Sequence, residues 1–124
     1  MRSNSQFDFD VPRGYCWLLE RGLVGYEPFS ALQPWYYLDA RHSFVVNERW
    51  PDPILDCERL VAFARRQDTD DVACFAMNGG KVAAIYLIHG WTREGYTIAE
   101  KYSDFWNWLK SVVDDIADCA DRQD

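Results

Sequence analysis

Apolar residues in the second half of the chain follow patterns that predict strands. Residues 60–65 (Leu-Val-Ala-Phe-Ala-Arg) and 72–77 (Val-Ala-Cys-Phe-Ala-Met) are short apolar runs separated by a polar turn. An Asn-Gly-Gly sequence at 78–80 supplies residues that accept positive φ, which is typical of a tight hairpin. An almost wholly apolar strand is expected at 81–89, and a short edge strand at 96–98. Together these segments predict an antiparallel meander.

The last part of the chain predicts an amphipathic helix over about residues 103–120. Ser103 is the expected N-cap, and the carboxylate of Asp104 lies near the positive end of the helix dipole. Apolar residues recur here at steps of three and four, the spacing of one helix face. The predicted inward positions are Phe105, Trp108, Leu109, Val112, Val113, Ile116 and Ala120.

The first half of the chain predicts shorter elements. A short helix is expected at 15–21, ended by Gly22 in a left-handed conformation. Prolines exclude a long element in the region that follows, so two helical pieces are predicted, at 34–38 and 39–47. Their aromatic rings are expected to pack on the sheet. Residues 1–13 are interpreted as a loose leader.

Strands followed by a helix predict the α+β class. The length of 124 residues suits one domain, spanning residues 1–124. We expect a mainly antiparallel sheet over residues 60–98, packed against short N-terminal helices and the C-terminal amphipathic helix. Hydrophobic residues make up 48% and charged residues 27% of the chain, which is typical of a globular protein and argues against disorder.

Charge narrows the class of partner. The chain has 13 basic and 20 acidic residues, a net charge of −7, whereas a nucleic-acid-binding protein needs a basic surface. The longest apolar run, Val82–Ile88, is too short to cross a bilayer, and no apolar signal segment occurs near the start. We therefore expect a cytoplasmic protein that binds neither nucleic acid nor membrane.

Cysteine and histidine show no pattern typical of a reactive site. Cys16, Cys57, Cys74 and Cys119 are scattered without the close pairs typical of zinc sites, and are interpreted as small core residues. His42 and His89 occur without a serine elbow. A Cys–His nucleophile pair is the alternative interpretation. No phosphate-binding glycine motif is present, so we expect neither a cofactor nor a structural metal.

The turn Asp68-Thr-Asp-Asp71 is the most distinctive polar segment. Its three carboxylates have the oxygen ligands that Mg²⁺ or Ca²⁺ prefers, which leaves a small metal-dependent hydrolase as one alternative. A partner-binding loop is another. The simplest interpretation is a solvated hairpin tip whose charge is offset by Arg65 and Arg66.

Three stretches share an order that points to a family. Residues 61–75 combine a strand, an acidic turn and a strand that reads acid-x-x-Cys-Phe. Residues 81–92 form a long apolar strand after a glycine turn, and residues 102–109 open a helix with Ser-x-Phe. Together they resemble the SUKH superfamily, which includes fungal cell-wall assembly regulators and bacterial immunity proteins. The resemblance covers about residues 59–117, and the N-terminal half departs from it because it has no Leu-Pro sequence.

The resemblance implies a single SUKH-like domain without catalytic residues. Bacterial members neutralise a toxin, often encoded beside them, by tight association. An acidic protein would be steered towards a basic toxin such as a nuclease. We therefore expect an immunity protein, monomeric or weakly dimeric. Asp68, Asp70 and Asp71 are the candidate charged contacts, and Trp35 and Trp91 the candidate anchors. The alternatives to an immunity protein are the metal-dependent hydrolase and a regulatory scaffold protein.

Overall fold

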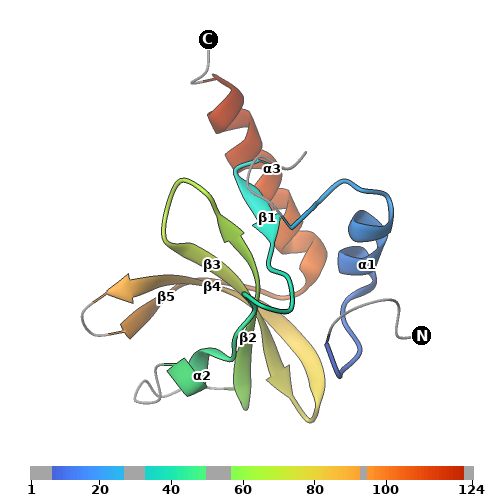
Figure 1. Ribbon diagram of the computed structural model, residues 1–124, viewed down its shortest axis with the longest axis vertical. Helices are drawn as coiled ribbons and strands as arrows, with labels where there is room; N and C mark the ends of the chain where they lie inside the picture. Colours follow the sequence, from blue (N-terminus) through green and yellow to red (C-terminus); the bar gives the residue numbers. More distant parts are fainter. Residues whose placement is uncertain (1–6, 27–32, 50–56, 93–94, 122–124) are drawn as a thin grey trace.

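Five antiparallel strands form one sheet in the order β1-β2-β3-β4-β5 (Figure 1). The computed structural model describes residues 7–26, 33–49, 57–92 and 95–121. The elements are α1 (Arg13–Glu20), β1 (Trp35–Tyr37), α2 (Val46–Arg49), β2 (Arg59–Arg66), β3 (Asp71–Asn78), β4 (Lys81–Thr92), β5 (Gly95–Tyr102) and α3 (Phe105–Asp121). The predicted α+β class and the C-terminal helix are confirmed. No helix in these ranges is long and apolar enough to cross a membrane.

The meander over β2 to β5 follows the predicted order. Asn78 pairs with Lys81 around a two-residue turn, in which Gly79 and Gly80 have φ of 60° and 73°. Only glycine adopts such angles in succession at little cost, which fixes the turn and the register of the hairpin. β4 and β5 are longer than predicted, because their pairing runs from Ile85 opposite Tyr102 to Thr92 opposite Gly95.

One face of the sheet packs against α1 and α3. Phe63 of β2 and Phe75 of β3 stack at its centre, with ring centroids 4.1 Å apart. Trp108 of α3 meets Phe63 edge to face at 5.1 Å, and Tyr15 of α1 does so at 5.9 Å. All four rings are buried. This aromatic centre ties both helices to the middle of the sheet.

The opposite face carries a second apolar cluster. It is covered by α2 and by the chain that leads into it: Val46 packs there, and Phe44 accepts a backbone hydrogen bond from Ala62. The buried members are Leu38, Val46, Leu60, Ala62, Val72, Cys74, Ala76, Tyr86, Ile88 and Tyr96. Because β2 and β3 are covered on both sides, their sequences are continuous apolar runs without alternation.

Two expectations for the region before β2 are wrong. Residues 34–38 contain a strand, β1, in which Trp35 pairs with Arg66 and Tyr37 with Ala64. Residues 39–47 begin as a turn, in which the carboxylate of Asp39 accepts hydrogen bonds from the backbone of Arg41 and His42. After this turn the chain pairs with β2, where the amide of Ala62 donates to the carbonyl of Phe44 and Val45 forms a bridge with Val61, so α2 starts only at Val46.

The expectation of a loose leader over residues 1–13 is wrong for the described part. Phe7 and Phe9 are buried, and the Phe7 ring lies 5.5 Å from that of Phe75. Asp8 and Asp10 alternate with them and are exposed. The segment is therefore anchored by its two rings and turns its carboxylates outward.

The N-cap of α3 is Asp104 and not Ser103. The amide of Asn107 donates to the Asp104 carboxylate at 2.8 Å, three residues along, as an N-cap requires. Ser103 instead accepts a hydrogen bond from the Asn107 side chain at 2.7 Å. Of the positions predicted to face inward, Val113 and Ala120 are exposed.

Close packing of α1 on α3 makes Gly14 sensitive to substitution. A Cβ at Gly14 would lie 2.6 Å from the buried ring of Phe105, whereas one at Gly25 would meet nothing within 4 Å. We expect Gly14→Ala to lower the free energy of unfolding by about 1–3 kcal/mol, as overpacking does. Gly25→Ala should change it by less than about 0.5 kcal/mol. Urea unfolding measures both, and equal stabilities would contradict this packing.

Candidate functional site

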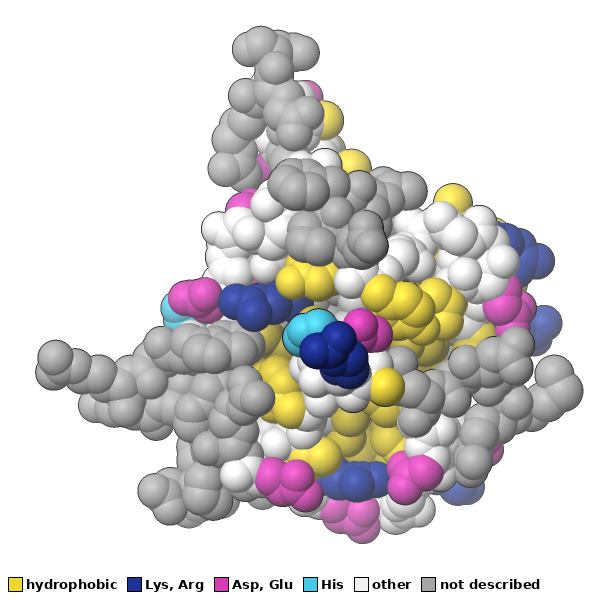
Figure 2. All heavy atoms as spheres, in the orientation of Figure 1, with side chains coloured by type: hydrophobic (Ala, Val, Ile, Leu, Met, Phe, Trp, Pro, Cys, Tyr) yellow, Lys and Arg dark blue, Asp and Glu magenta, His cyan; other side chains and the backbone are white. Residues whose placement is uncertain are grey.

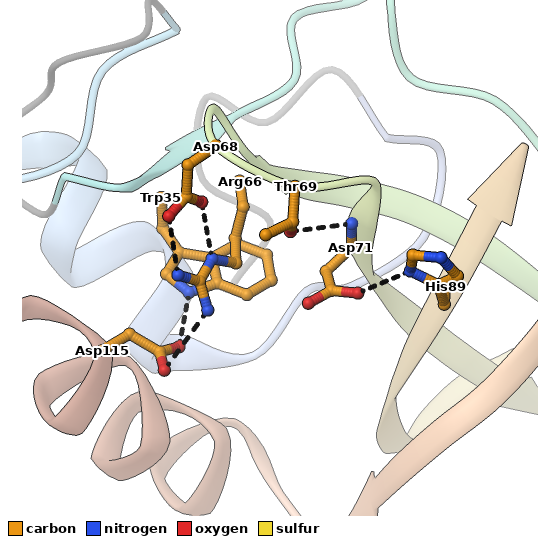
Figure 3. Close-up of polar contacts among 7 residues, drawn as sticks. All are labelled: Trp35, Arg66, Asp68, Thr69, Asp71, His89 and Asp115. Carbon is orange, nitrogen blue, oxygen red and sulfur yellow. Dashed lines mark hydrogen bonds and ion pairs between the residues drawn. The ribbon is translucent and has the colours of Figure 1, made fainter. Parts of the chain in front are cut away.

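The acidic turn between β2 and β3 is neutralised largely by its own hairpin (Figure 3). Arg66 donates from Nε and Nη2 to the two carboxylate oxygens of Asp68, each at 2.9 Å. This two-point geometry matches the planar guanidinium to the carboxylate. The hydrogen bond to Asp68, assisted by the nearby Asp115 charge, raises the pKa of Arg66 despite its partial burial.

The other two aspartates of the turn face different groups. Asp71 Oδ1 lies 3.1 Å from His89 Nδ1 on β4, and the Asp71 amide donates to the Thr69 hydroxyl at 3.1 Å. Asp70, with a half-exposed side chain, lies 3.8 Å from Arg65. The carboxylates thus diverge towards separate partners instead of converging on one point. In the described ranges, no three His, Cys, Asp or Glu side chains gather closely enough to hold a metal ion.

A carboxylate from α3 joins the turn to the core. Asp115 Oδ1 lies 3.4 Å from Arg66 Nη1, and Asp115 Oδ2 accepts a hydrogen bond from the indole N–H of Trp35 at 2.9 Å (Figure 3). Since Asp115 is 49 positions from Arg66 and 80 from Trp35, local sequence could not reveal this contact. The acidic turn is therefore held in place relative to α3.

Neither candidate aromatic anchor is found on the described surface. Trp35 is 2% exposed, and its ring packs edge to face on Trp108 at 5.4 Å. The expectation that Trp35 contacts a partner is therefore wrong; it is a core residue with a satisfied indole. The backbone of Trp91 belongs to β4, but its side chain lies outside the described residues.

Sequence reasoning missed the aromatic side chains that are exposed. Trp17 of α1 is 41% exposed and Trp106 of α3 is 49% exposed. The two helices meet at Gly14, one turn before Trp17, where an added Cβ would touch Trp106. Val113, two turns beyond Trp106 on α3, is 55% exposed. We call Trp17, Trp106 and Val113 the helical apolar surface. The sequence does indicate that Trp106 is exposed, because it lies outside the set of apolar positions that face inward on α3.

Charge on the described surface is mixed. Figure 2 shows acidic side chains beside basic or histidine side chains on the face that it draws. Among the described contacts, Asp39 Oδ1 lies 2.7 Å from His42 Nδ1, and this hydrogen bond lowers the pKa of Asp39. A basic side chain also contacts an exposed ring: the guanidinium carbon of Arg21 lies 3.9 Å from the ring centroid of Trp17, a cation–π contact.

Cys74 does not suit the alternative nucleophile pair. Cys74 is fully buried under the second apolar cluster, and burial raises its thiol pKa, which disfavours the reactive thiolate. His42 and His89 each face an aspartate. Cys16 and Cys57 are half-buried thiols that form no disulfide, and the side chain of Cys119 is outside the described residues.

Comparisons with protein-family models, with curated proteins and with solved structures each found no match to this chain. The similarity to the SUKH superfamily stays a prediction that rests on residues 61–75, 81–92 and 102–109.

The bond between Trp35 and Asp115 yields a stability prediction. Asp115→Ala leaves the buried indole N–H without its acceptor, so we expect the free energy of unfolding to fall by about 1–3 kcal/mol. Asp115→Asn keeps an oxygen acceptor and should retain most of the stability. Asp114→Ala, at the exposed neighbouring position, should cost less than about 0.5 kcal/mol. Urea unfolding that shows equal losses for the two alanine variants would contradict the role of this bond.

Proposed function

We propose that this chain is a non-enzymatic protein-binding domain that acts in the cytoplasm as an immunity protein. Its partner would be a toxin with a basic surface, bound directly and in equal number by a monomer or weak dimer. The toxin is inferred from the SUKH resemblance. Protein binding itself has separate support from the molecular surface.

The observation that carries the proposal is the helical apolar surface. Tryptophan supplies large contact area at a small cost in side-chain entropy, and it is enriched among the residues that dominate binding energy. Trp17 and Trp106 are each exposed by two fifths or more, although the core buries other tryptophans fully. Their exposure costs free energy in the isolated chain, and contact with a partner would recover it.

Charge supports a basic partner. The ion pairs around the acidic turn do not alter the net charge of the chain, which is −7. Long-range steering depends on this net charge, so association with a basic protein is accelerated and weakens as salt rises. Of the three turn aspartates, Asp70 has the longest ion pair and is the contact most available to a partner.

Truncation of the exposed tryptophans tests the surface. Trp106→Ala and Trp17→Ala should each weaken the complex with the toxin by roughly 30-fold, equivalent to about 2 kcal/mol at an interface hot spot. Leu23→Ala, at another exposed apolar side chain, is the control and should leave affinity within threefold. Titration calorimetry measures these constants, and unchanged affinity in both tryptophan variants would exclude this surface.

Neutralisation tests the function. The protein encoded by the neighbouring gene is purified and mixed with the chain, and complex formation and residual toxic activity are measured. We expect a one-to-one complex, loss of activity, and an association rate that falls with added salt. Full toxic activity at saturating chain overturns the immunity role, and turnover of a substrate by the chain alone would favour the hydrolase alternative.

A further inference from the structure

The sheet has an open backbone edge at the start of β4. On one side β4 pairs with β3 from Lys81 opposite Asn78 onward, with a bulge at Ala83. On the other side pairing with β5 begins only at Ile85, opposite Tyr102. Residues 81–84 therefore have no strand partner on that side among the described residues. An open strand edge presents amide and carbonyl groups that another chain can pair with.

A groove runs along this edge. At Tyr102 the chain leaves the sheet and turns at Ser103 and Asp104 into α3. The space between this turn, the β3–β4 hairpin and residues 8–12 has a volume of about 560 Å³ and is open to solvent. In Figure 1 the N-terminal segment lies beside the hairpin tip. Four of the seven hairpin residues that line the groove are small, namely Gly79, Gly80, Ala83 and Ala84, and small side chains allow a second backbone to approach closely.

The charges of the groove specify its occupant. Three carboxylates line it, from Asp8, Asp10 and Asp104, against one ammonium group, that of Lys81, so the lining carries a net −2. Asp8 and Asp10 are fixed outward because Phe7 and Phe9 are anchored in the core. The 4.0 Å pair of Asp8 with Arg59 joins exposed side chains and offsets little of this charge.

Apolar side chains lie beside these carboxylates. Val11, Val82 and Phe105 line the same groove and offer a surface for the methylene stem of a long cationic side chain. A second copy of this chain fits less well, because pairing two such edges would bring two net-negative grooves together. Charge and shape thus favour an extended basic segment of another protein.

We propose that residues 81–84 of β4 accept an extended segment of a partner protein as an additional strand, with an arginine or lysine of that segment held by the groove carboxylates. This inference rests on the proposed function, since it identifies how a protein partner is recognised. Backbone pairing sets the register, and the carboxylates select a basic side chain.

A peptide probe tests strand addition without the toxin. The probe is an acetylated, amidated hexapeptide of alternating threonine and valine with one central arginine. Nuclear magnetic resonance of the full chain should show amide shift changes and slowed hydrogen exchange at residues 81–84. A probe that is N-methylated at alternate residues keeps its charge but loses backbone donors, and should bind at least tenfold more weakly. Equal binding of both peptides, or shifts confined to Trp17 and Trp106, overturns the proposal.

Two variants of the chain separate charge from backbone pairing. Asp10→Lys should weaken binding of the probe at least tenfold, whereas Asp114→Lys makes the same charge change on exposed α3 and should have a much smaller effect. Ala83→Pro removes an amide at the extra residue of the bulge between β3 and β4, with Ala83→Ser as its control. If Ala83→Pro fails to fold, Asp10→Lys and the methylated peptide still decide the outcome.

The remaining outcomes separate this inference from the proposed function. A toxin complex that forms while amide exchange at residues 81–84 stays unchanged overturns strand addition and leaves the binding function intact. Absence of any toxin complex overturns the immunity role, whereas the peptide result stands independently. A dimer of the chain, detected by light scattering and abolished by Ala83→Pro, would assign the edge to a second copy and overturn the proposal.

Discussion

Burial of both faces of β2 and β3 is the constraint on which the rest of the structure depends. The stack of Phe63 on Phe75 is covered by Trp108 and Tyr15, and Leu60 and Cys74 are buried on the other face by the chain that leads into α2. At these two strands neither face of the sheet is open to a partner. The exposed tryptophans lie on the outer surfaces of the helices, and the open end of β4 lies at a strand edge.

Elements whose pattern is local were predictable from sequence. The two glycines at 79–80 specify the hairpin turn on their own, and the stripe through Phe105, Trp108 and Val112 specifies the face of α3. β1 was missed because a three-residue strand shows too little alternation to differ from a helical turn. The shift of the N-cap from Ser103 to Asp104 is a one-residue error between two good capping residues.

The position of the candidate site was predictable from sequence, but its contacts with distant residues were not. The location of the acidic turn between two strands, and the offset of its charge by Arg65 and Arg66, follow from neighbouring residues, and the structure bears them out. Trp35 is brought to Arg66 by the pairing of β1 with β2, and Asp115 by the packing of α3 on the sheet, and no short window of sequence contains either contact. The burial of Trp35 has the same cause, since its place at the edge of the sheet under α3 depends on tertiary contacts.

The paired charges of the turn and the excess charge of the chain have different roles in binding. Exposed ion pairs such as Asp70 with Arg65 contribute little to stability, and a basic partner can compete for them at small cost. The partly buried bond from Trp35 to Asp115 is more costly to break because the indole of Trp35 is buried and water does not fully replace its acceptor. Asp115 is thus a structural carboxylate, whereas Asp70 can exchange its arginine partner for a basic group of another protein.

The helical apolar surface and the open edge of β4 adjoin each other through the N-terminal segment. Asp10 and Val11 line the groove along β4, and they also line a second groove that contains Trp17. One partner could therefore cover both features. A four-residue edge is too short to supply the contact area of a stable complex, about 800 Å² on each partner. The tryptophans would then supply most of the affinity, while the strand edge and its carboxylates would determine which basic segment is accepted.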